Sequence, residues 1–277
     1  MGDDFDDIER DDWGEGPEDA YVTDARDELL KLINARPQEV FYERQLQVFF
    51  ENRFYHWVTS KALDELAEDR EVQSGFRPLT RYGGGAAKAR FFFSTQLRYW
   101  TRKANEAVKL ISAYSDPVFT RAVGRQAEML FDAGLARIGF IPQGQETREH
   151  NSNRWEESDH DLDRIYVRDG LAYGAEIKNK LAYIEADELF TKIRMCKHLG
   201  VTPLFIARMM PKSWINEVWK AGGFCLIFKF QLYPFGQEAF AKEINQKLEL
   251  PVDCPRALAD GTVQRFLKWH LKRVTTA

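Results

Sequence analysis

Two carboxylates and a lysine occur in this sequence in a pattern that suits metal-dependent phosphate chemistry. Residues 160–180 read HDLDRIYVRDGLAYGAEIKNK, with an Asp-Gly pair at the centre that predicts a two-residue hairpin turn. Because side chains alternate between the faces of a strand, Glu176 and Lys178 share a face of the second strand, and Asp163 projects from one face of the first. Two carboxylates that converge across a hairpin suit a hard divalent cation, and a nearby lysine can hold or activate an attacking water.

A simpler interpretation of the same residues exists. An exposed strand could carry Glu176 and Lys178 as solvated side chains or as an ion pair across the hairpin. However, Ile165 and Val167 share the face of Asp163, so that face is not divided cleanly between solvent and core. The apolar neighbours therefore favour a site over a solvated surface.

Two further features of the hairpin bear on the site. Asp161 lies on the Asp163 face, either as a ligand or as an acid at the entrance of the strand, and the spacing favours Asp163. The small residues Ala172, Gly174 and Ala175 would let a bulky substrate approach the sheet.

The pattern resembles the PD-(D/E)xK nuclease superfamily. In that family an acidic residue commonly precedes Glu-x-Lys by about a dozen positions across a hairpin, as Asp163 precedes Glu176 here. The family often adds a glutamate on the helix before the sheet, and Glu128 in GRQAEMLFDAGLARIGF fits that place. Leu162 stands where many members have a proline. The resemblance covers roughly residues 117–230.

The resemblance implies a set of roles. The catalytic residues would be Asp163, Glu176, Lys178 and Glu128, and the cation would be held by Asp163, Glu176 and the carbonyl group of Ile177. Asp161 and Lys180 would be auxiliary. The implied cofactor is Mg²⁺, for which Mn²⁺ would substitute. The implied activity is that of a DNA endonuclease of the restriction, defence or recombination and repair type, and cleavage of both strands suggests a homodimer.

The 277 residues are enough for one large or two modest domains. Composition and periodicity divide the chain into a disordered acidic tail (1–22), a helical domain ending in a hairpin (23–95), a helical linker (96–116) and an α/β domain (117–277). The expected fold of the last domain is a mixed, restriction-endonuclease-like sheet flanked by helices. Its expected elements include helices at 117–136 and 186–199 and strands at 137–142 and 203–208.

Residues 24–95 resemble a winged helix-turn-helix domain, with three short helices followed by a hairpin around Gly83–Gly85. In such a domain the helix at 59–70 would enter the major groove of DNA. The hairpin would contact phosphates through basic residues, namely Arg77, Arg81, Lys88 and Arg90. The helix itself is acidic, with Asp64, Glu65, Glu68 and Asp69, which suits a protein partner better than DNA.

The net charge of −4 is distributed unevenly along the chain. Residues 1–27 hold twelve acidic and two basic residues, whereas the remainder holds 37 basic and 31 acidic residues. A basic body attracts phosphate backbones. Two alternatives to a DNA endonuclease stay open: a DNA-binding or adaptor protein built on a nuclease-like scaffold, and a nuclease that cleaves RNA.

Apolar runs and cysteines exclude other classes of protein. The apolar runs are too short to span a bilayer, and the acidic N-terminus lacks the apolar core of a signal peptide. We therefore expect a cytoplasmic protein without a membrane partner. Three widely separated cysteines indicate neither a disulfide framework nor a metal clip.

Overall fold

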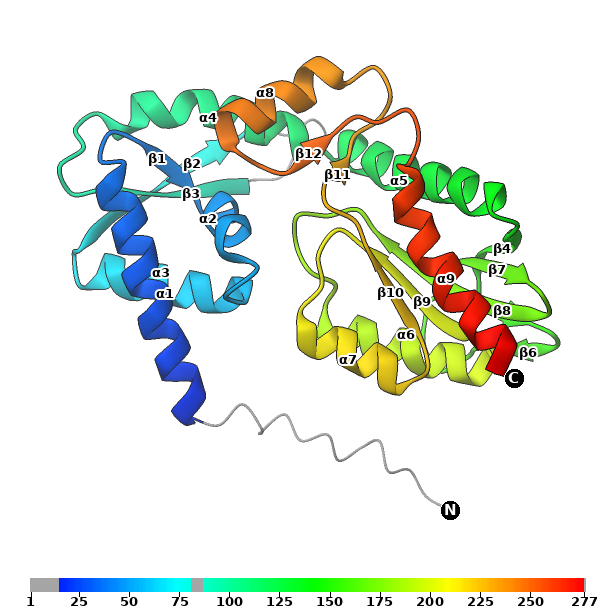
Figure 1. Ribbon diagram of the computed structural model, residues 1–277. Helices are drawn as coiled ribbons and strands as arrows, with labels where there is room; N and C mark the ends of the chain where they lie inside the picture. Colours follow the sequence, from blue (N-terminus) through cyan, green and yellow to red (C-terminus); the bar gives the residue numbers. More distant parts are fainter. Residues whose placement is uncertain (1–14, 81–86, 277) are drawn as a thin grey trace. The chain divides into compact units, whose positions relative to one another are not determined.

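A computed structural model describes residues 15–80 and 87–276 and divides the chain into two compact units, with the boundary between Ser115 and Asp116 (Figure 1). The first helix begins at Glu15, so the part of the expected disordered tail from residue 15 to residue 22 is helical. The rest of that tail lies outside the described residues.

Unit 1 combines helices with a small antiparallel sheet. Its elements are α1 (Glu15–Ala35), β1 (Val40–Tyr42), α2 (Glu43–Phe50), α3 (His56–Glu68), β2 (Val72–Leu79), β3 (Ala87–Ser94) and α4 (Trp100–Tyr114). The strands lie in the order β1-β3-β2, and β2 and β3 form the expected hairpin. Its hydrophobic core includes four fully buried residues, Leu29, Phe41, Leu63 and Phe92.

The segment expected as a linker packs within unit 1. The ring of Trp100, at the start of α4, stacks on Phe93 with a centroid distance of 4.9 Å. The same indole fills the space beside Gly75, where any Cβ atom would collide with it. Residues 100–114 are therefore part of the first unit and do not form a linker between the two.

Unit 2 is built on a five-stranded mixed sheet. Its elements are α5 (Pro117–Arg137), β4 (Ile141–Thr147), β5 (Glu149–His150), β6 (Asn153–Arg154), β7 (Leu162–Arg168), β8 (Leu171–Lys178), α6 (Ala186–Leu199), β9 (Thr202–Ala207), α7 (Lys212–Lys220), β10 (Phe224–Ile227), β11 (Gln231–Leu232), α8 (Glu238–Leu248), β12 (Val252–Asp253) and α9 (Asp260–Thr276). The sheet order is β10-β9-β8-β7-β4, with β8, β9 and β10 parallel and the other pairs antiparallel.

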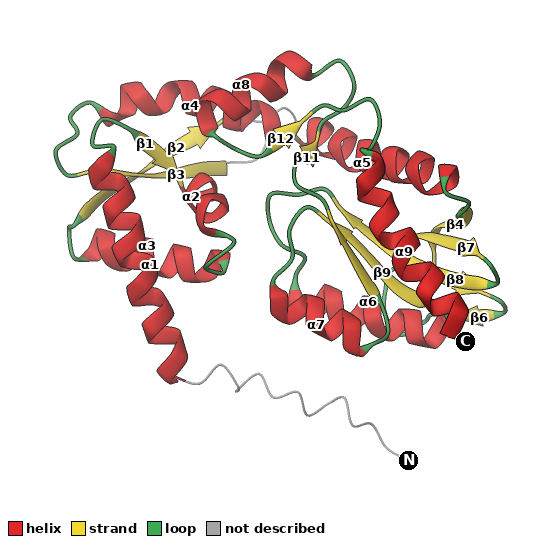
Figure 2. Cartoon of the chain, viewed as in Figure 1, coloured by secondary structure: helices red, strands yellow, loops and turns green. Residues whose placement is uncertain are grey.

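Helices cover both faces of this sheet (Figure 2). On one face, Phe131 of α5 and Phe266 of α9 pack against Tyr173 of β8. On the other, Met195 of α6 packs against Ile165 of β7, and α7 covers the β9 side. The predicted mixed α/β architecture, with a sheet flanked by helices, is confirmed.

Local signals in the sequence account for the element ends that surround the site. The carboxylate of Asp116 accepts hydrogen bonds from the first turn of α5, and Pro117 occupies the first helical position. Asp169 and Gly170 have φ angles of 48° and 75°, as a type I′ hairpin turn requires. Gly200 ends α6 in the left-handed conformation.

Some elements differ from the sequence prediction. The strand expected at 137–142 begins at Ile141, because α5 continues to Arg137 and Gly139 turns the chain with a φ angle of +83°. It then extends to Thr147, five residues beyond the expected end of the strand. The helix α8 was not expected, although its buried residues Ala241, Ile244 and Leu248 recur at helical spacing. The strands β11 and β12 were not expected either, because two-residue strands are too short to show a period.

Candidate active site

The structure brings Asp163 and Glu176 together across the β7–β8 hairpin. Arg164 pairs with Ala175 in the antiparallel register, which places Asp163 opposite Glu176 on the face covered by α6. The Oδ2 atom of Asp163 accepts a hydrogen bond of 2.6 Å from the backbone N–H of Ile177. The Glu176 side chain is only 2% exposed. The strand alternation therefore predicted the convergence of these two carboxylates.

Two lysines contact the buried carboxylate of Glu176. Nζ of Lys178 lies 2.5 Å from Oε1, and Nζ of Lys192 on α6 lies 2.5 Å from Oε2. Lys178 also lies 2.7 Å from Oε1 of Glu188. Each oxygen of the Glu176 carboxylate is therefore paired with one ammonium group.

Burial and the charge of Glu176 disfavour the ionised form of Asp163. Burial raises the pKa of Asp163, and the charge of Glu176 raises it further, to about 7, against the lowering effect of the Ile177 N–H and the two lysines. Burial lowers the pKa of Lys178, but Glu176 and Glu188 raise it more, so the pKa is raised overall. Lys178 is therefore a firmly protonated ammonium group.

The carboxylates fit a divalent cation. No group of three or more His, Cys, Asp or Glu side chains able to hold a metal ion occurs within residues 15–80 and 87–276. Mg²⁺ commonly uses only one or two protein carboxylates and keeps several waters. Asp163 and Glu176 supply two carboxylates, and the raised pKa of Asp163 indicates that added positive charge beside this carboxylate would be stabilised. The carbonyl of Ile177 stays a predicted ligand.

Arg164 organises a second charged cluster on the opposite, α5-facing side of the sheet. Its Nε donates to both oxygens of Asp132, at 3.2 and 3.1 Å, and its Nη2 donates to Glu128 at 3.0 Å. Its Nη1 donates to the carbonyl of Asp163, and Tyr166 adds a hydrogen bond to Asp132. Glu128 therefore contacts Arg164. The same guanidinium group donates to the backbone carbonyl of Asp163 and so connects Glu128 with the carboxylate pair.

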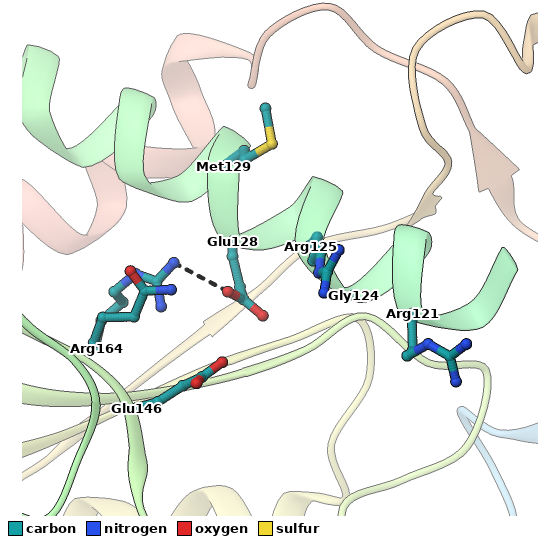
Figure 3. Close-up of a pocket in the computed structure, with 8 residues that line it drawn as sticks. Arg121, Gly124, Arg125, Glu128, Met129, Glu146 and Arg164 are labelled. Atoms are coloured by element: carbon teal, nitrogen blue, oxygen red, sulfur yellow. Dashed lines mark hydrogen bonds and ion pairs between the residues drawn. The ribbon is translucent and has the colours of Figure 1, made fainter. Parts of the chain in front are cut away.

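An open pocket of about 650 Å³ lies beside this cluster. Figure 3 shows Arg121 and Arg125 projecting from α5, while Glu128 reaches Arg164. Gly124 lies between the arginines, and nothing stands within 4 Å of where its Cβ would be. The two exposed arginines make the α5 side of the pocket cationic.

The auxiliary candidates differ from one another in position. Asp161 precedes β7, and its carboxylate is 3.9 Å from Lys192. Lys180 follows β8 and is exposed. Gly174 was expected to admit substrate, but an added Cβ would lie 2.8 Å from Cys196 and Leu162, so this glycine serves the packing of α6 on the sheet.

The basic residues of the unit 1 hairpin are partly committed to internal contacts. Arg90 pairs with Asp64 of α3 and lies over the rings of Phe76 and Phe92, rather than projecting toward phosphates as expected. Arg77 donates to Asn105 of α4 at 2.7 Å.

The two remaining basic residues expected to contact phosphates from the hairpin are Lys88 and Arg81. Lys88 is exposed, and Arg81 lies outside the described residues.

Sequence reasoning missed the residues that surround the carboxylate pair. Lys192 lies on the apolar face of α6, between Leu189 and Met195, which is a signal of a buried, paired lysine. Strand alternation places Arg164 on the core face of β7, where a charged group needs partners. Asp132 lies one turn after Glu128 on α5. Their partners are distant in sequence, so periodicity alone could not assign them.

Comparison with protein-family models, curated proteins and solved structures found no match to this chain. Among the described residues, no helix is both long and apolar enough to cross a membrane.

Proposed function

We propose that this chain is a Mg²⁺-dependent DNA endonuclease of the PD-(D/E)xK type. The observation that carries the proposal is the pair formed by half-buried Asp163 and buried Glu176 beside the ammonium of Lys178. The support from the fold is the hairpin that bears these residues, preceded by α5 with Glu128 and followed by α6. This arrangement resembles a restriction-endonuclease-like core.

The residues of the pair have distinct roles in phosphodiester hydrolysis. Asp163 and Glu176, with the carbonyl of Ile177, would hold the cation, which supplies Lewis-acid stabilisation of charge on the phosphate. Lys178, kept protonated by its two glutamates, orients the water and donates to a phosphate oxygen rather than acting as a general base. Water attacks phosphorus in line and gives up a proton to solvent, the P–O3′ bond breaks, and O3′ takes up a proton from solvent, which leaves 5′-phosphate and 3′-hydroxyl ends.

The arginines on α5 extend this proposal to substrate binding. Arg121 and Arg125 are exposed one helical turn apart and line the pocket on the α5 side of the sheet, across the sheet from the side chain of Asp163. Backbone phosphates that flank the scissile bond would be held there, since such contacts position a nucleic acid without reading its sequence.

Unit 1 would assist as a winged-helix-like module. Its order of helix, strand, two helices and two strands supports that resemblance. Its acidic helix α3 is neutralised in part by Arg26, which contacts Glu65 at 3.1 Å and Asp69 at 2.5 Å. Lys88 is an exposed cation on the described part of the hairpin and would contact DNA.

A substrate panel tests the function. Supercoiled plasmid, linear, single-stranded and branched DNA, and RNA are incubated with Mg²⁺, Mn²⁺ or EDTA. We expect cleavage of DNA with either metal and none with EDTA, and duplex breaks that follow nicks unless two copies act together. Selective cleavage of RNA would move the same chemistry to that substrate. A protein inert on every nucleic acid would contradict the proposal.

A further inference from the structure

Lys192 holds a position on Glu176 that a metal ion would otherwise compete for. Its Nζ lies 2.5 Å from Oε2 of Glu176 and 3.9 Å from Oδ1 of Asp161, and it donates a hydrogen bond to the carbonyl of Asp161. Its side chain is 4% exposed. A buried ammonium is strongly held by its anionic partner, because losing that partner leaves an uncompensated charge.

Lys178 is attached to Glu176 in a different way. Its ammonium has a second carboxylate, Glu188, at 2.7 Å, and its side chain is 17% exposed. Lys178 can therefore leave Glu176 and keep an ion pair. Lys192 cannot move to a second carboxylate that is equally close, since the carboxylate of Asp161 is 3.9 Å away.

We propose that Lys192 is a fixed counter-ion of Glu176 that restricts this site to one divalent cation. The cation would be shared by Asp163 and Oε1 of Glu176 once Lys178 has moved to Glu188. The ammonium of Lys192, between Oε2 of Glu176 and Asp161, occupies the place where a second cation would find two carboxylates. The inference rests on the proposed metal-dependent function.

The stoichiometry of Mn²⁺ binding tests this role without reference to activity. Mn²⁺ is titrated into the full chain, and free Mn²⁺ is measured by electron paramagnetic resonance. We expect one ion per chain for the wild type and for Lys192→Arg, which keeps the charge. We expect two ions for Lys192→Met, because Glu176 and Asp161 are then free to bind a second. Lys197→Met, an exposed position on the same helix, should bind one ion.

The possible results separate this inference from the proposed function. A wild type that binds two ions overturns the inference even if Lys192→Met does not fold, and leaves a metal-dependent nuclease intact. A folded Lys192→Met variant that still binds one ion also overturns it. A wild type that binds no Mn²⁺ contradicts the metal-dependent function itself.

Discussion

Neighbouring residues of β7 build two charged clusters of opposite character on the two faces of one sheet. Arg164 faces α5 and meets two carboxylates and a carbonyl with well-formed hydrogen bonds. Asp163 faces α6 and stands opposite another carboxylate, with its pKa raised to about 7 by burial and by that neighbour. In the first cluster the charges meet through hydrogen bonds, whereas in the second the two lysines pair with Glu176 and the neighbouring carboxylate raises the pKa of Asp163.

The difference separates a stabilising cluster from a functional one. A buried charge with matched partners contributes to the fold, and removing one partner is costly. A buried pair of acids that repel each other costs stability, and such costs are typical of sites that bind a cation or carry out chemistry. Substitutions in the two clusters should therefore have different effects.

The largest effect is expected from Asp163→Ala. Losing one of two anionic ligands should reduce DNA cleavage by about a thousandfold or more. The reason is that the cation stabilises the charge of the transition state by several kcal/mol. Thermal stability should be unchanged or higher, since the repulsion is relieved. Nicking of plasmid across a Mg²⁺ titration measures the effect, with Asp161→Ala as the milder control. Equal activity of Asp163→Ala and wild type would remove Asp163 from the site.

Lys178→Met should impair turnover while leaving binding intact. We expect about a hundredfold to ten-thousandfold loss of the single-turnover rate, because the ammonium no longer orients water and phosphate. Mn²⁺ and DNA should still bind. A variant that fails to bind the metal would instead give Lys178 a role in organising the carboxylates.

Asp132→Ala should act on stability rather than on chemistry. It leaves the buried guanidinium of Arg164 short of its main partner and should lower the free energy of unfolding by about 3 kcal/mol. Glu128→Gln is the milder control, because Glu128 is 24% exposed and Arg164 keeps Asp132. Chemical denaturation measures both. If Glu128→Gln were as inactive as Asp163→Ala yet fully stable, Glu128 would belong to the catalytic site, as the sequence suggested.

The raised pKa of Asp163 predicts a pH dependence of stability in the metal-free protein. The ordinary pKa is 3.8, so between about pH 4 and pH 7 the unfolded chain releases a proton that the folded chain retains. Stability from this group therefore falls as the pH rises through that range and is level above it. Unfolding in EDTA at several pH values should show a smaller decline for Asp163→Asn. Identical pH profiles would show that Asp163 ionises normally in the folded state.

The smallest effect is expected from substituting both Arg121 and Arg125 with alanine. DNA affinity should fall several-fold. The slope of log affinity against log salt concentration should become shallower by the equivalent of about two phosphate contacts. The matched comparison is Lys88→Ala in unit 1, which should change the salt dependence by about one contact. A double variant with wild-type affinity and salt dependence would exclude the α5 surface from DNA binding.

The sequence predicted the elements whose signals are local. The Asp-Gly turn and strand alternation predicted that Asp163 and Glu176 converge, and the periodicity of residues 186–199 predicted α6 with its observed bounds. Contacts between distant segments were not predictable. Arg164 meets Asp132 across 32 positions, and α4 packs on the hairpin of unit 1, because burial and complementary charge selected these partners.

The most direct test of the contrast between the two clusters compares Asp163→Asn with Asp132→Asn in the same experiment. Each variant is measured for Mg²⁺-dependent plasmid nicking, at a temperature where it is fully folded, and for its free energy of unfolding without metal. The account predicts that Asp163→Asn loses nearly all activity at equal or greater stability, while Asp132→Asn loses stability and keeps most of its activity. An active Asp163→Asn, or an Asp132→Asn that is inactive but fully stable, would contradict it.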